Sequence, residues 1–133
     1  MDIRFVRATA NEVVAELEVS ARHLQPYGIV HGGVYSGLVE TVASVGAGIH
    51  ALAMGRAVVG LENHTSFLHA VREGRLRATA RPLTAGRRTH VWEASVVDAT
   101  ERVVATGRVR LLCLEQGAWL AGQTVTSRRS DVG

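Results

Sequence analysis

The longest apolar stretch of this chain, residues 32–55, contains a single charged side chain, Glu40. Its apolar residues recur at spacings of three and four, which predicts a helix from about Gly33 to Met54. The expected core-facing stripe comprises Val34, Leu38, Val42, Val45, Ile49 and Leu52. A surface helix of this length normally carries a charged face, and an ionised carboxylate is rarely buried without a partner. Glu40 therefore requires a chemical role, or a place in solvent or beside an arginine of a partner subunit.

Alternating patterns on both sides of the helix predict an antiparallel sheet. Residues 12–20 alternate between apolar and charged side chains, which is the period of a strand. Further strand-like runs occupy residues 3–7, 57–68, 75–82, 89–98 and 102–114, and the short polar turns between the later runs suit antiparallel neighbours. With 133 residues the chain forms one domain, and we expect an α+β fold of one long helix and an antiparallel sheet of five or six strands.

The expected helix and sheet leave apolar surface uncovered. A sheet has two faces and one helix covers only one of them, while the helix is apolar beyond the stripe that packs on its own sheet. We therefore expect a homo-oligomer, most simply a two-fold dimer.

Composition narrows the classes of function. All fifteen basic residues are arginines spread along the chain, with two each of Phe, Trp and Tyr, so a nucleic-acid-binding surface is not indicated. The single cysteine, Cys113, fits a reducing compartment, and the N-terminus lacks a signal-peptide pattern, so we expect a cytoplasmic protein. Glu40 and His50 argue against a membrane span. The six histidines include no His-x-x-x-His pair, so no metal site is expected.

Two glycines follow His31 at the expected start of the helix. The first N–H groups of a helix have no partner inside the helix and carry positive partial charge. With Gly32 and Gly33 no side chain obstructs these donors, so a ligand oxygen can reach them, which is the requirement of an oxyanion hole. A tight turn alone would also use two glycines. Further along, small residues share one side of the helix with Glu40. That face comprises Gly33, Gly37, Glu40, Ser44 and Ala47.

The segment from Gln25 to Gly33, Gln-Pro-Tyr-Gly-Ile-Val-His-Gly-Gly, followed by Leu38, Glu40 and Ser44, resembles the signature of hotdog-fold acyl-CoA thioesterases. It is most similar to the branch of the phenylacetate-pathway (PaaI-like), 4-hydroxybenzoyl-CoA and 1,4-dihydroxy-2-naphthoyl-CoA thioesterases. The resemblance covers residues 11 to 115 approximately. It implies a hotdog fold, in which a curved sheet wraps around a long central helix, as a single domain over residues 1–115. Residues 116–133 are then a C-terminal tail, whose last ten residues we expect to be loose.

The resemblance implies roles for five residues near the thioester. Gly32 matches the glycine whose backbone N–H binds the thioester carbonyl, and Gln25 matches a side chain close to that carbonyl or to the attacking water. His31 matches a residue beside the thioester, either catalytic or bracing the loop. Glu40 matches the catalytic carboxylate, supplied by the opposite subunit, which either attacks the thioester or activates a water. Ser44 matches a hydroxyl that holds the water or the glutamate.

The resemblance also implies a binding site for an acyl-CoA with an aryl or medium-chain acyl group. The expected substrate-binding residues are Gly33, Asn63, His64, Arg87, Arg88 and Thr89. Asn63 and His64 match positions that line the acyl pocket. The turn at residues 87–89 matches the site of the nucleotide phosphates, although charged residues are common on turns without a ligand. The family implies no cofactor beyond the CoA of the substrate, and a homotetramer built as a dimer of dimers.

Two other hotdog proteins stay open as alternatives. The signature that resembles hotdog dehydratases has a proline shortly after the catalytic histidine. In this chain no proline follows His31-Gly32-Gly33. A non-catalytic module that binds acyl-CoA commonly lacks the acid, which this chain keeps as Glu40, and accompanies a DNA-binding domain, for which 133 residues leave no room. A serine-hydrolase elbow, Gly-x-Ser-x-Gly, is absent.

Overall fold

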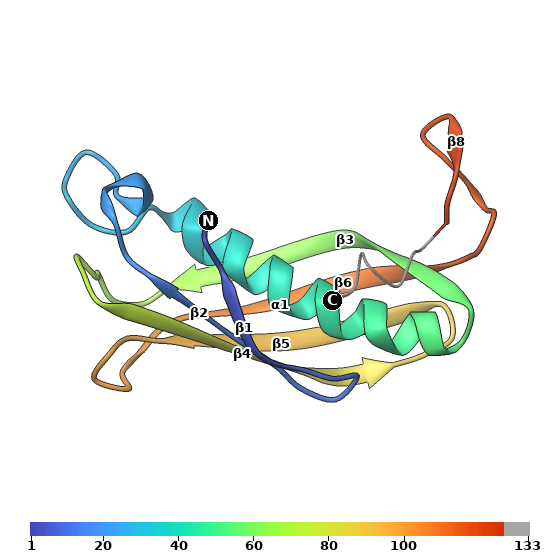
Figure 1. The fold of residues 1–133 in the computed structure, drawn as a ribbon, viewed down its shortest axis with the longest axis horizontal. Helices are drawn as coiled ribbons and strands as arrows, with labels where there is room; N and C mark the ends of the chain where they lie inside the picture. Colours follow the sequence, from blue (N-terminus) through green and yellow to red (C-terminus); the bar gives the residue numbers. More distant parts are fainter. Residues whose placement is uncertain (127–133) are drawn as a thin grey trace.

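The computed structural model describes residues 1–126, in which one long helix is wrapped by a six-stranded antiparallel sheet (Figure 1). The helix, α1, is Gly32–Ala53, and a short 3₁₀ helix, η1 (Ala21–His23), precedes it. The strands are β1 (Arg4–Ala8), β2 (Val13–Glu18), β3 (Arg56–Phe67), β4 (Arg75–Ala85), β5 (Thr89–Val97) and β6 (Val103–Glu115), in the spatial order β1-β2-β4-β5-β6-β3. This is the predicted hotdog fold, with element ends shifted by only a few residues.

A small hairpin follows β6. It consists of β7 (Trp119–Leu120) and β8 (Gln123–Thr124), and it projects away from the sheet (Figure 1). Hydropathy periodicity indicates neither this hairpin nor η1, because elements of two or three residues are shorter than one period of the pattern. The prediction of a loose end concerns residues 124–133, of which 127–133 lie outside the described residues.

Helix α1 is the core helix of the domain. By length and hydropathy it is the one helix among residues 1–126 that could cross a bilayer. The sheet curves around it, however (Figure 1). Leu38, Val39, Val42 and Ala43 are fully buried in the core between the helix and the sheet. Burial against the sheet of the same chain therefore accounts for the apolar residues on one side of the helix.

The core-facing stripe predicted for α1 is only partly correct. Leu38 and Val42 are fully buried, whereas the other members, Val34, Val45, Ile49 and Leu52, are partly exposed. In the second half of the helix the buried residues are small ones, Ala43, Gly46, Ala47 and Ala51, and the indole of Trp92 on β5 lies directly against Gly46. A Cβ on Gly46 would be 2.3 Å from Cη2 of Trp92. In this half the bulkier apolar side chains, Val45, Ile49 and Leu52, are partly exposed on the flanks of the helix.

Gly46→Ala should destabilise the domain by about 1–3 kcal/mol, because the added methyl overpacks the contact with Trp92. Gly48→Ala is the matched control, since a Cβ there meets nothing nearer than Cγ2 of Val58 at 3.9 Å. Alanine has the higher helix propensity, so this control should be neutral or stabilising by up to about 1 kcal/mol. Urea unfolding measures both variants, and equal midpoints would contradict the close packing of Trp92 on α1.

Candidate active site

The start of α1 presents one free backbone donor. His31 is the N-cap, and its Nδ1 accepts the N–H of Gly33 at 2.8 Å. The N–H of Val34 donates to the His31 carbonyl at 2.9 Å. Within residues 1–126 the N–H of Gly32 has no acceptor, and it lies at the positive end of the helix. His31 therefore acts as a cap in this structure, and Gly32 supplies the open donor.

The loop between η1 and α1 carries Gln25 in a fixed position. Arg72 donates from Nη1 to the carbonyl oxygens of Tyr27 at 2.9 Å and Gly28 at 3.2 Å. Oε1 of Gln25 accepts the N–H of Tyr27. Because the amide oxygen is engaged, its NH₂ group is the part of Gln25 left to bind a ligand oxygen. Arg72 was not expected at this loop, because its contacts with Tyr27 and Gly28 span more than forty residues of chain.

An apolar cavity of about 300 Å³ opens beside this loop. Gln25 and Gly32 line it together with Tyr35 and Phe67, whose ring centroids are 5.9 Å apart. A Cβ on Gly32 would come within 2.6 Å of the Phe67 ring, so glycine is what lets the ring lie against the helix start. The cavity thus combines apolar walls with a backbone donor and an amide.

Glu40 lies half-buried between α1 and the edge strand β3. Asn63 donates from Nδ2 to its Oε1 at 3.1 Å, and Ser44 donates from Oγ to its Oε2 at 3.4 Å. A Cβ on Gly60 would be 2.6 Å from Oε2. The structure therefore brings together Glu40 and Ser44, as their i,i+4 spacing predicted, and adds Asn63 as a direct partner of the carboxylate.

Gly32 and Glu40 of one chain are too far apart to act on one carbonyl group. Eight residues of helix separate them by about 12 Å along the axis, whereas reacting atoms must approach to about 3–3.5 Å. Of the residues described, Glu40 is not among those lining the cavity beside Gly32. One chain therefore holds the two expected halves of a catalytic site in separate places.

The predicted nucleotide-binding residues Arg87, Arg88 and Thr89 are exposed on the turn between β4 and β5. The N–H of Gly86 donates to the Thr89 carbonyl at 2.9 Å and closes this turn. The β4–β5 turn lies near the last turns of α1, at the end of the molecule opposite the start of that helix (Figure 1). The structure does not bring these residues to the cavity of their own chain.

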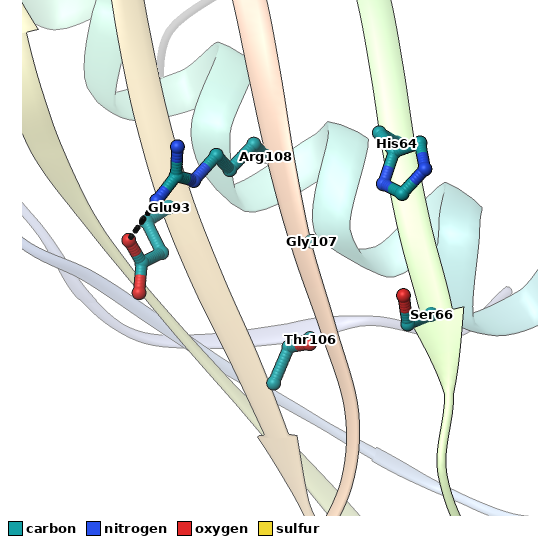
Figure 2. A pocket seen from close by; sticks show the side chains of 6 residues that line it. All are labelled: His64, Ser66, Glu93, Thr106, Gly107 and Arg108. Atoms are coloured by element: carbon teal, nitrogen blue, oxygen red, sulfur yellow. Dashed lines mark ion pairs between the residues drawn. The ribbon is translucent and has the colours of Figure 1, made fainter.

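His64 does not lie with Glu40 either. Asn63 faces α1, so the next residue of β3 points to the outer face of the sheet. There His64 borders an open, polar depression together with Ser66, Thr106 and the ion pair of Glu93 with Arg108, 3.8 Å apart (Figure 2). Strand alternation therefore separates the two residues that the resemblance placed in one pocket.

A contact between the partly exposed His50 and the buried His90 connects α1 to the turn that carries Arg87 and Arg88. The rings of His50 and His90 meet edge to face with centroids 4.7 Å apart, and His90 is 0% exposed. Nδ1 of His90 accepts the indole N–H of Trp92 at 3.3 Å, which requires that nitrogen to be unprotonated. Burial, followed by the charge of His50, lowers the pKa of His90, while a hydrogen bond with the backbone of Gly86 opposes the shift.

The domain should therefore lose stability as the pH falls below about 6.5, the pKa of an unfolded histidine. Below that pH the unfolded chain takes up a proton that the folded His90 resists, so the free energy of unfolding decreases until the lowered folded pKa is reached. Urea unfolding across this window measures the slope. His90→Gln should flatten it and the exposed His69→Gln should not; equal slopes in the two variants would contradict this assignment.

Within residues 1–126, no three side chains of the His, Cys, Asp and Glu types gather in a way that could hold a metal ion.

Comparison with known proteins places this geometry in a family. The model of the thioesterase superfamily matches residues 27–105, which include Gly32, Glu40 and Asn63. A protein of Mycobacterium tuberculosis provisionally named an esterase is 38% identical over 117 residues, covering 86% of this chain and 84% of that protein. Its solved structure superposes with a TM-score of 0.83 at 40% identity, covering 85% and 91% of the two chains.

Two further relatives carry more specific names. The 1,4-dihydroxy-2-naphthoyl-CoA hydrolase of Escherichia coli is 35% identical over 109 residues, covering 82% of this chain and 79% of that protein. A thioesterase of Staphylococcus aureus has been solved as a glutamine-to-alanine mutant (TM-score 0.79, 26% identity) and as a glutamate-to-alanine mutant (TM-score 0.78, 27% identity). The alignments cover 85% and 84% of this chain and 93% of that one.

Proposed function

The chain belongs to the thioesterase superfamily, and we propose that it hydrolyses an acyl-CoA thioester to the free acid and CoA at a site shared by two subunits. The observation that carries this proposal is the free N–H of Gly32 at the positive end of α1, beside a cavity that also presents the amide of Gln25. Fixed donors of this kind stabilise the oxyanion of acyl transfer.

In the proposed reaction the thioester carbonyl oxygen lies at the N–H of Gly32, with the NH₂ group of Gln25 nearby. Glu40 either adds to the carbonyl carbon or takes a proton from a water that adds to it. Negative charge develops on the carbonyl oxygen, and the carbon–sulfur bond then breaks to release CoA as its thiolate. Direct attack gives a mixed anhydride that water hydrolyses, so both routes consume one water. Ser44 holds the water or the carboxylate through its hydroxyl.

The separation of Gly32 and Glu40 within one chain supports a site made by two subunits. A two-fold dimer with antiparallel α1 helices would bring Glu40 of one subunit toward the Gly32 end of the other. The same symmetry would move the turn with Arg87, Arg88 and Thr89 toward that end, where these residues would bind the nucleotide phosphates. We propose that two such dimers pair into a tetramer.

The mutants of the S. aureus thioesterase support the choice of Gln25 and Glu40. The glutamine and the glutamate replaced in that protein are fifteen residues apart, which is the spacing of Gln25 and Glu40 here. The same two residue types at the same spacing in a protein named as a thioesterase favour a shared role in the reaction.

We propose an aryl or medium-chain acyl group as the substrate class. The cavity beside Gly32 is bordered by the rings of Tyr35 and Phe67, which suits a flat apolar group, and the E. coli relative is named for an aromatic acyl-CoA. A soluble, cytoplasmic enzyme would meet such CoA esters directly, without a cofactor of its own.

Hydrolysis of a panel of CoA esters tests the proposal. Benzoyl-, 4-hydroxybenzoyl-, phenylacetyl-, hexanoyl- and palmitoyl-CoA would be supplied separately, and the free thiol read with a disulfide reagent. We expect turnover of the aryl and hexanoyl esters and little of palmitoyl-CoA. Binding of these esters without turnover of any would overturn the proposal in favour of a non-catalytic acyl-CoA-binding module.

A further inference from the structure

We propose that Asn63 is a positioning residue, which holds the Glu40 carboxylate in one orientation, in place of the acyl-pocket role expected for it. The inference rests on the proposed function, because it assigns Asn63 a task only if Glu40 performs the chemistry. Asn63 reaches Glu40 from β3, across the gap between the edge of the sheet and the helix.

Every polar group of the Asn63 side chain is engaged. Its Nδ2 donates to Oε1 of Glu40 at 3.1 Å and to the carbonyl oxygen of Ser36 at 3.0 Å. Its Oδ1 accepts the hydroxyl of Thr65 at 2.6 Å. An amide has two N–H donors, and both find an acceptor here. Turning the amide over would set Oδ1 against two oxygen acceptors, so the contacts fix which end of Asn63 faces Glu40.

These contacts leave the two oxygens of Glu40 unequal. Oε1 is held by Asn63, whereas Oε2 faces Gly60 and receives only the long contact from Ser44 at 3.4 Å. A Cβ on Gly60 would stand 2.6 Å from Oε2, so the glycine keeps that side free. We therefore assign Oε2 as the oxygen that attacks the thioester or takes the proton from water.

A β-bulge in β3 places Asn63 opposite the carboxylate. In the pairing with β6, Gly60 is opposite Leu111 and Glu62 is opposite Arg110, so Leu61 is an extra residue. The extra residue reverses the alternation of the strand, and both Gly60 and Asn63 face α1. Regular alternation from Gly60 would turn Glu62 toward Glu40, and two adjacent carboxylates would oppose ionisation. The bulge thus supplies an amide donor where a second acid would otherwise stand.

A purely structural role for Asn63 is the alternative, because its bond to the Ser36 carbonyl also ties β3 to α1. The pH profile separates the two roles. Asn63→Asp keeps the shape of the side chain but sets a carboxylate beside Glu40, so protonation of the pair should occur at higher pH. We expect the acidic limb of kcat/KM to move up by at least about one pH unit, with activity recovering on the alkaline side.

Ser66→Asp is the matched control, since it adds the same charge to β3 on the outer face of the sheet, and its pH profile should equal that of the wild type. Asn63→Leu removes the hydrogen bonds at similar volume and should lower kcat by up to about 10²-fold with little change in KM. Thr65→Val, which removes only the hydroxyl that orients Asn63, should lower kcat less, and it keeps the test valid if substitutions of Asn63 fail to fold.

The outcomes distinguish this inference from the proposed function. If Glu40→Gln is inactive while Asn63→Asp keeps the wild-type pH profile and Thr65→Val keeps the wild-type kcat, the positioning role is overturned and the thioesterase reading stands. If Glu40→Gln hydrolyses the esters at the wild-type rate, the positioning role of Asn63 and the proposed catalytic role of Glu40 are both overturned. A raised acidic limb in Asn63→Asp alone, with Ser66→Asp unchanged, establishes the positioning role.

Discussion

Replacing Glu40 by glutamine should lower kcat by about 10²–10⁴-fold, the contribution expected of a positioned carboxylate in acid–base or covalent catalysis. The amide has the shape of the carboxylate and its oxygen can still accept from Asn63, so the variant should fold and bind substrate. It cannot take a proton from water or form an anhydride. We therefore expect KM and the melting temperature to stay close to those of the wild type, measured by steady-state hydrolysis of the best CoA ester and by thermal unfolding.

Glu62→Gln is the matched control for this experiment. Glu62 lies on the same strand as Asn63 but is exposed, and it forms an ion pair with Arg110 at 3.7 Å. The substitution Glu62→Gln removes one negative charge near the site and leaves the contacts of Glu40 unchanged, so activity should persist. Equal rates for Glu40→Gln and Glu62→Gln would show that the carboxylate of Glu40 is not catalytic.

Local patterns in the sequence predicted the elements and one part of the site. The spacing of apolar residues gave α1 and the alternating runs gave the strands, because both periods depend on neighbours along the chain. Glu40 and Ser44 were expected to meet, since residues four apart share a helix face. The open start of α1 followed in the same way from Gly32 and Gly33, and the structure adds that His31 caps it.

The contacts that the sequence could not reveal join distant segments. Asn63 meets Glu40 because one extra residue, Leu61, reverses the alternation of β3, and no hydropathy pattern marks a bulge. The same reversal carries His64 to the outer face. Trp92 determines which side of α1 is core, since its indole needs the space at Gly46. In each case the position of the side chain depends on how the sheet packs against α1, and the sequence of the strand or of the helix alone does not determine that packing.

Gly32→Pro should lower kcat by about 10²–10³-fold, the usual cost of losing one oxyanion-hole donor. Proline removes the N–H and is well tolerated as the first residue of a helix. The preceding residue, His31, already has φ −66° and ψ 137°, which is the extended conformation required before proline. Gly32→Ala is the control, because it adds a similar steric load on Phe67, which is 57% exposed and able to move, yet it keeps the N–H. Steady-state hydrolysis compares the two, and equal losses would attribute the effect to Phe67 and not to the missing donor.

Mixing the two inactive variants tests whether the halves of the site come from different subunits. If Gly32 of one chain works with Glu40 of the other, a dimer of Gly32→Pro with Glu40→Gln contains one intact site and one doubly altered site. Random re-pairing after unfolding and refolding of an equal mixture should then restore about a quarter of the wild-type activity. If both groups act within one chain, every subunit in the mixture remains defective and activity stays at the level of the separate variants. Recovery would also fix the helices as antiparallel partners, because the separation of about 12 Å between Gly32 and Glu40 along α1 can be closed only by a second helix running the other way.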